Sequence, residues 1–92
     1  MEEQKIVVTI SGKDKVGIVS EVTTVLAKYS VNIEDIKQTL MQEHFVMFLL
    51  GDISKSEFSF KEIKDALLSA CESIEMECWV QRKKIFDKMH MI

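Results

Sequence analysis

Proline is absent from this chain of 92 residues, and glycine occurs only three times. Because flexible linkers between domains are rich in such residues, the composition argues against a loose multidomain arrangement. A chain of this length also matches the size of one small domain with a modest core. We therefore expect residues 1–92 to form a single domain.

Long apolar runs are also missing. No stretch approaches the roughly 18 apolar residues that a membrane span needs. Glu2 and Glu3 stand where a secretory signal would carry basic residues. With 47% apolar and 29% charged residues, the balance is that of a soluble globular protein, and we expect a cytoplasmic location.

Cysteine and histidine are too few and too scattered to predict a metal site. Cys71 and Cys78 are seven positions apart, which fits neither a CxxC motif nor zinc spacing, and His44 and His90 are isolated. We expect reduced thiols that pack as small apolar side chains, with no metal and no cofactor. No Ser-His-Asp or Cys-His pattern supports catalysis, so the sequence predicts a protein that is not an enzyme.

Positive charge is also scarce. The net charge is −3, and the densest basic cluster is the three residues Arg82, Lys83 and Lys84. Three charges release too few counterions to sustain binding to a nucleic acid, so we expect no nucleic-acid partner.

What the chain does contain is a strand, a glycine-bearing turn and a helix near its start. Residues 4–11 alternate, with Ile6, Val8 and Ile10 on one face, which predicts a strand. Apolar residues at helical spacing predict a helix over 16–29, with Asp14 as its cap. The turn leaves backbone N–H groups free at the helix N-terminus, where an anion or a carboxylate is favoured.

Two further strands follow as an antiparallel hairpin, over 32–42 and 45–50. Alternation in the first of them is imperfect, and a bulge near Glu34 and Asp35 would restore it. The second is apolar on both faces. Helices can cover one face, and the other needs either a second subunit or the C-terminal tail. This strand is the best indication of a homodimer in the sequence.

The remaining elements complete the pattern. Ser59 and Glu62 match a capping box at the start of a strongly amphipathic helix. Residues 75–81 alternate as a fourth strand, with Trp79 on the face opposite the core. The tail carries apolar residues at helical spacing and is expected to form a short helix docked on the sheet; these are Ile85, Phe86, Met89 and Ile92.

This order predicts an α+β, ferredoxin-like βαββαβ fold. It has a four-stranded antiparallel sheet, two helices on one face and a short C-terminal helical tail. A fold of this kind does not by itself give a function.

The segments 8–19 and 31–36 resemble an ACT domain, in which a turn of Asp or Asn, Gly and an aliphatic residue opens the first helix. The ending, 85–92, is similar to that of free-standing bacterial and archaeal ACT proteins. Two positions depart from the pattern. Met91 stands where that group often has arginine, and Val16 stands where many ACT domains have proline.

The resemblance implies regulatory binding of a small molecule, usually an amino acid, at an interface between two ACT domains. Asn32, with Ile33 beside it, would come from the partner subunit. The first turn would face the ligand; its residues are Gly12, Asp14, Val16, Gly17 and Ile18. The chemistry agrees, since helix N–H groups suit an α-carboxylate, Asp14 suits an ammonium group, and Asn32 can donate and accept.

Other proteins of this topology fit less well. An acylphosphatase would need an arginine in the first loop, but the single arginine is Arg82. A metal chaperone would need a CxxC there, and an RNA-binding domain would need aromatic and basic residues on its central strands. One alternative stays open: a dimeric module that regulates a partner protein without an amino-acid ligand. Its surface could include the acidic residues Glu34, Asp35, Glu75 and Glu77.

Overall fold

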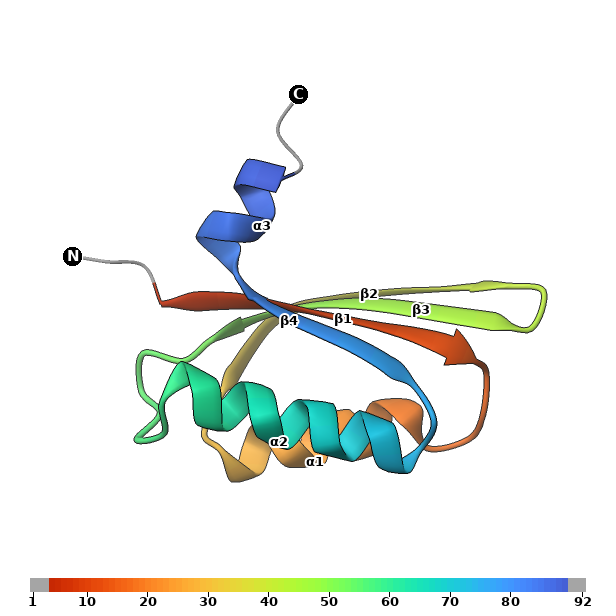
Figure 1. Cartoon of the computed structure of the whole chain (residues 1–92), viewed down its shortest axis with the longest axis horizontal. Coiled ribbons are helices and arrows are strands. Elements are labelled where there is room, and N and C mark those ends of the chain that lie inside the picture. The colour runs from red at the N-terminus through yellow and green to blue at the C-terminus, as the bar shows by residue number, and fades with distance from the viewer. Residues whose placement is uncertain (1–3, 90–92) are drawn as a thin grey trace.

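The computed structural model describes residues 4–89, which form one antiparallel four-stranded sheet in the order β2-β3-β1-β4. The helices α1 and α2 cover one face, and α3 rises from the other (Figure 1). The elements are β1 (Lys5–Lys13), α1 (Ile18–Lys28), β2 (Asn32–Met41), β3 (His44–Asp52), α2 (Phe60–Ser73), β4 (Glu77–Arg82) and α3 (Lys83–Met89). This arrangement confirms the predicted α+β, ferredoxin-like βαββαβ fold.

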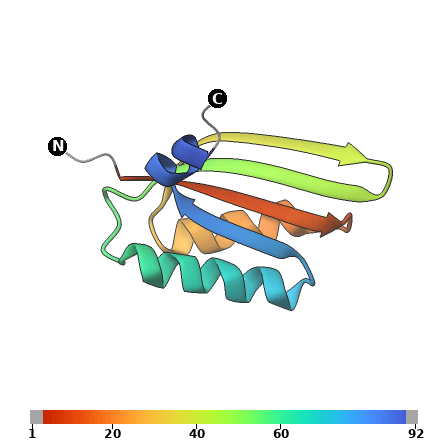
Figure 2. The same cartoon turned by 45° about the horizontal axis from the view of Figure 1, so that its top comes forward.

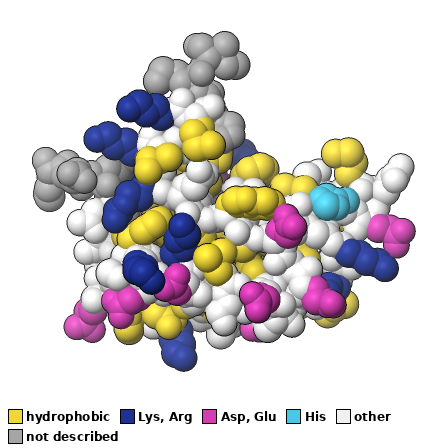
Figure 3. All heavy atoms as spheres, in the orientation of Figure 1, with side chains coloured by type: hydrophobic (Ala, Val, Ile, Leu, Met, Phe, Trp, Pro, Cys, Tyr) yellow, Lys and Arg dark blue, Asp and Glu magenta, His cyan; other side chains and the backbone are white. Residues whose placement is uncertain are grey.

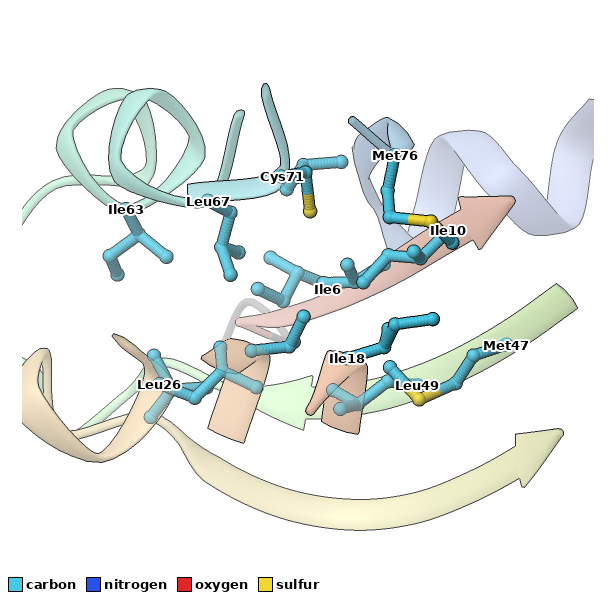
Figure 4. Packing of buried hydrophobic residues seen from close by; sticks show 14 of the residues in the cluster. Ile6, Ile10, Ile18, Leu26, Met47, Leu49, Ile63, Leu67, Cys71 and Met76 are labelled. Carbon is cyan, nitrogen blue, oxygen red and sulfur yellow. The ribbon is translucent and has the colours of Figure 1, made fainter. Parts of the chain in front are cut away.

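The core lies between the sheet and the two helices. Ile6, Val8 and Ile10 are fully buried, as the alternation along β1 predicts. The helices contribute apolar side chains one or two turns apart, which meet those of the strands (Figure 4). The helix residues buried in this layer are Ile18, Val22, Leu26, Ile63, Leu67 and Cys71.

Two local predictions are confirmed. The Ser59 hydroxyl accepts from the backbone N–H of Glu62 at 3.1 Å, and the Glu62 carboxylate accepts from the N–H of Ser59 at 2.9 Å. This is the capping box, which satisfies two N–H groups that α2 cannot pair internally. The register between β2 and β3 also shifts between Ile33 and Asp35, where the bulge was expected.

The predicted start of the first helix is wrong. β1 continues to Lys13, because that residue still pairs with His44 of β3, and α1 begins only at Ile18. The residue at its N-cap is Gly17, and no side chain makes the cap hydrogen bond there. Asp14 is not the cap, since it lies well before the helix and its own N–H donates to the carbonyl of Glu43 at 2.9 Å.

Two strand boundaries also differ from the prediction. β4 begins at Glu77, because Glu75 has a φ of 59°, in the left-handed region that a strand cannot use. β3 runs to Asp52, since that residue still pairs with Lys5 of β1. Both changes lengthen or move strands by about two residues, the usual uncertainty of element ends.

The tail helix is present but covers only part of the open face. Figure 2 shows α3 above one end of the sheet, near the start of β1 and the end of β4. Val7 is 7% exposed, whereas Phe48 and Trp79 on the same face remain 43% and 49% exposed. The predicted docking is therefore correct for this end alone. Ile92 lies outside the described residues.

Both cysteines are free, and their side chains are hydrogen-bonded to each other between α2 and β4. The pKa of the Cys78 thiol lies well above its ordinary value, because it donates this bond to Cys71 and because it is partly buried. No helix within residues 4–89 combines the length and the apolar character that crossing a bilayer requires.

The packing predicts a clear contrast between two leucines. Leu67 is fully buried, so Leu67→Ala should lower the free energy of unfolding by about 2–5 kcal/mol through lost contacts and a cavity. Leu40 is 55% exposed, and Leu40→Ala should change the free energy of unfolding by about 0.5 kcal/mol or less. Urea unfolding of both variants measures the difference. Equal losses would contradict the placement of the core.

Candidate functional site

The turn between β1 and α1 presents backbone donors at its end. Gly17 has a φ of 91°, a left-handed conformation that glycine adopts without the cost a side chain would add. This conformation turns the chain sharply into α1, and Glu21 donates to the Gly17 carbonyl at 2.9 Å to close the first helical turn. Without a side-chain cap, the first N–H groups of α1 stay available to an anion.

Three contacts hold this turn in place. The Asp14 N–H donates to the Glu43 carbonyl in the hairpin between β2 and β3. The Lys15 ammonium donates to the carbonyl of Ile74 at 2.8 Å and lies 3.6 Å from a carboxylate oxygen of Glu75. The turn is thus fixed between the hairpin on one side and the end of α2 on the other.

The predicted first-turn residues gather here, but they differ in what they expose. Val16 is fully exposed, which is unusual for an apolar side chain beside a rigid turn. Ile18 is 3% exposed and belongs to the core, so only its backbone can face a ligand. Gly12 lies within β1, and a Cβ there would come within 2.8 Å of the Met76 sulfur, which gives this glycine a packing role.

Beside Asp14 is a hollow of about 300 Å³ at the outer edge of the sheet. Its walls come from the end of β2 and the start of β3, and the apolar ones are Leu40 and Phe45. Sequence alone does not reveal this hollow, because it depends on how far the hairpin extends past the helices (Figure 1).

Asn32 lies elsewhere, in a hollow of about 230 Å³ that it lines with Asp52, Ser54 and Lys55. The pKa of the Asp52 carboxyl is below its ordinary value, chiefly because the backbone N–H of Ser54 donates to it, at 2.8 Å. The donating Ser54 N–H thus fixes a negative group next to Asn32. Ile33 is half-buried and packs against the core.

One chain does not bring the two groups of predicted residues together. Asn32 pairs with Asp52, which pairs with Lys5 at the start of β1, whereas Gly12 pairs with Phe45 near its end. Seven residues of strand separate these positions, about 23 Å at a rise of about 3.3 Å per residue. A site that uses both groups requires two chains.

Comparison with known proteins identifies the family of this chain. A family model described as "ACT domain" matches residues 4–81. The chain belongs to the ACT domain family. A "UPF0237 protein" of Methanococcus maripaludis is 46% identical over 89 residues, which are 97% of this chain and 99% of that relative. ACT domains are regulatory ligand-binding domains.

Solved structures share the fold. An "ACT domain protein from Streptococcus pneumoniae" has a TM-score of 0.80 at 29% identity, over 94% of this chain and 97% of that one. The ligand-free regulatory subunit of aspartate kinase from Thermus thermophilus has a TM-score of 0.67 at 18% identity, over 87% of this chain and 52% of that one. The second likeness shows the ACT fold alone.

Sequence analysis did not predict two of the contacts that hold the turn between β1 and α1, because their partners come from distant parts of the chain. Glu43 and Ile74 lie 29 and 59 residues beyond the positions they hold, Asp14 and Lys15. Neither carbonyl has a sequence signature, since every residue carries one. These contacts are visible only once the fold is known.

The left-handed conformation of Gly17 predicts that two substitutions there will lower the free energy of unfolding by different amounts. Nothing lies within 4 Å of a Cβ placed there, so Gly17→Ala should cost only the left-handed backbone, about 1–2 kcal/mol of unfolding free energy. Gly17→Asn should cost less, because asparagine tolerates this conformation. Urea unfolding of the two variants tests the order, and a larger loss for asparagine would show that space rather than φ limits this position.

Proposed function

We propose that this chain is a cytoplasmic regulatory protein, not an enzyme, that binds an amino acid at the interface of a homodimer. Residues 1–92 would act as one ACT domain in each subunit. The observation that carries the proposal is the fixed, uncapped N-terminus of α1 beside the fully exposed Val16. An apolar side chain and a row of free N–H donors are what an amino-acid ligand and a second subunit would cover.

The edge of the sheet supplies a surface on which two chains can meet. β2 is an edge strand, and eight of its ten residues are exposed. A long unpaired edge of this kind favours pairing with another strand. If two β2 strands pair antiparallel about a two-fold axis, Asn32 of the partner subunit lies at the end of the sheet where Asp14 is found.

In this arrangement each group has a chemical role. The first N–H groups of α1 bind the α-carboxylate of the ligand, where the helix dipole favours negative charge. The exposed carboxylate of Asp14 faces the α-ammonium group. Asn32 of the partner subunit donates and accepts, and the ligand's side chain rests in the hollow near Leu40 and Phe45.

Membership of the ACT domain family supports the class of function, because ACT domains are regulatory ligand-binding domains. The Thermus thermophilus structure, at 18% identity, adds only the fold.

Thermal unfolding against a panel of amino acids tests the proposal. One ligand, at about 100 times its dissociation constant, should raise the free energy of unfolding by about 2.7 kcal/mol. Asn32→Ala removes a hydrogen bond of about 0.5–1.5 kcal/mol and should lower that stabilisation to about 1.3–2.2 kcal/mol at the same ligand concentration. Because the site needs two chains, the same ligand should also strengthen dimer formation in sedimentation experiments.

The matched control is Ser69→Ala, an exposed position on α2 far from either hollow, which should leave the ligand-induced shift unchanged. A shift that persists in full in Asn32→Ala would remove Asn32 from the site. The absence of a shift with every amino acid would favour the alternative, a dimeric module that acts on a partner protein.

A further inference from the structure

Two free thiols meet between α2 and β4, and the proposed amino-acid site uses neither of them. Cys71 is fully buried in the last turn of α2, and Figure 4 shows its sulfur directed into the interior. Cys78 pairs with the buried Ile10 of β1, packs against the core and donates a hydrogen bond to the Cys71 sulfur. Two sulfur atoms in contact on packed elements have the proximity that a disulfide requires.

The backbone of the loop between the two cysteines folds back on Cys71. The Cys71 carbonyl accepts from the N–H of Met76 at 2.8 Å and from the N–H of Ile74 at 3.2 Å. Glu75 between them has a φ of 59°, the left-handed conformation that commonly ends a helix. The contact between the two sulfurs therefore follows from a fixed backbone, not from a chance side-chain rotamer.

The same loop holds the turn between β1 and α1. The Lys15 ammonium donates to the carbonyl of Ile74 and lies beside the Glu75 carboxylate. The Met76 sulfur packs against Gly12, where a Cβ would come within 2.8 Å of it. A covalent bond that closed this loop would therefore act directly on the residues that position the turn.

The surroundings of the two thiols favour a small, neutral oxidant. Cys71 is closed to solvent, and Cys78 is only partly exposed. Figure 3 shows acidic side chains along α2, and the exposed carboxylates around the loop are those of Glu72, Glu75 and Glu77. Their negative charge repels an anionic disulfide such as oxidised glutathione, whereas it does not repel hydrogen peroxide.

We propose that Cys71 and Cys78 are a modification site, which hydrogen peroxide oxidises to an intramolecular disulfide that clamps the loop holding the turn between β1 and α1. In the first step, the Cys78 thiol gives up its proton and its sulfur attacks one oxygen of the peroxide, which yields a sulfenic acid and one water. The Cys71 sulfur then attacks the Cys78 sulfur, and the sulfenic hydroxyl leaves with the proton of Cys71 as a second water. The two thiols lose two electrons, and the peroxide gains them.

The hydrogen bond between the thiols assists the first step. Because Cys78 donates to the Cys71 sulfur, the pKa of the Cys71 thiol is lowered despite its burial. One proton therefore leaves the pair more readily than it would leave an isolated buried thiol. The remaining proton can move between the two sulfurs, so the sulfur that solvent reaches, that of Cys78, can carry the charge when the oxidant arrives.

Peroxide treatment of the full-length protein tests the site. The product should be lighter by two hydrogen atoms, both cysteines should fail to react with iodoacetamide in denaturant, and dithiothreitol should reverse both changes. Oxidised glutathione at the same concentration should react more slowly. Thiols that remain reactive, a sulfinic acid as the main product, a disulfide between two chains, or faster oxidation by glutathione would each overturn the proposal.

Cys78→Ala tests whether the two cysteines act together. The variant removes the partly exposed sulfur from β4 and leaves Cys71 buried without a partner. Cys71 should then stay reduced under the same peroxide treatment. If it is oxidised as fast as in the unchanged protein, Cys78 is not the site of attack and the proposal is wrong.

Amide hydrogen exchange tests the clamp. In the oxidised protein the N–H groups of Met76 and Asp14 should exchange about tenfold more slowly or less, because the loop and the turn open less often. The N–H of Ser56, which donates to Ile53 between β3 and α2, should exchange at an unchanged rate. Equal exchange at Met76 before and after oxidation would contradict the clamp.

Lys15→Met is the matched variant, because it keeps most of the side chain and removes the ammonium group that donates to Ile74. Oxidation should still protect Met76 in this variant but should no longer protect Asp14. Protection of Asp14 to the same degree would show that the loop does not act on the turn through Lys15. No ligand is added in these experiments, so their outcome is separate from that of the proposed amino-acid site.

Discussion

The alternation of side chains along β1 is the constraint on which the rest of the structure depends. This strand pairs with β3 on one side and β4 on the other, so it joins the two halves of the fold. Ile6, Val8 and Ile10 point into the core, and the residues between them point to the open face. A slip of one residue would exchange the two faces of β1, move Ile6, Val8 and Ile10 out of the core and place Lys5 beneath the helices.

Because that alternation can be recognised in the amino-acid sequence, most of the fold could be predicted from the sequence. The capping box at Ser59 and the bulge before Asp35 depend on residues close in sequence, and both were predicted. The start of α1 was not, because Asp14 gives its N–H to Glu43 instead of serving as the cap. The extent of the tail helix over the open face likewise depends on distant packing, which no local pattern of apolar residues specifies.

The candidate site could be predicted in its residues but not in its geometry. Sequence analysis predicts that Asp14, Gly17 and Asn32 lie in turns that could face a ligand. Only the strand register shows that the first-turn residues and Asn32 lie at opposite ends of the sheet. That separation also gives a physical reason for the proposed association. A domain with a modest core gains stability by covering exposed apolar side chains such as Val16, and a ligand seated between two chains adds its own binding energy to the contact.

One row of residues crosses the whole sheet from edge to edge, in the order Lys37, Phe48, Thr9, Trp79, as the pairing of the four strands shows. Lys37 is on β2, the strand that would pair at the edge in the proposed dimer. By thermodynamic reciprocity, a ligand that strengthened this edge contact would itself bind more tightly to the associated protein.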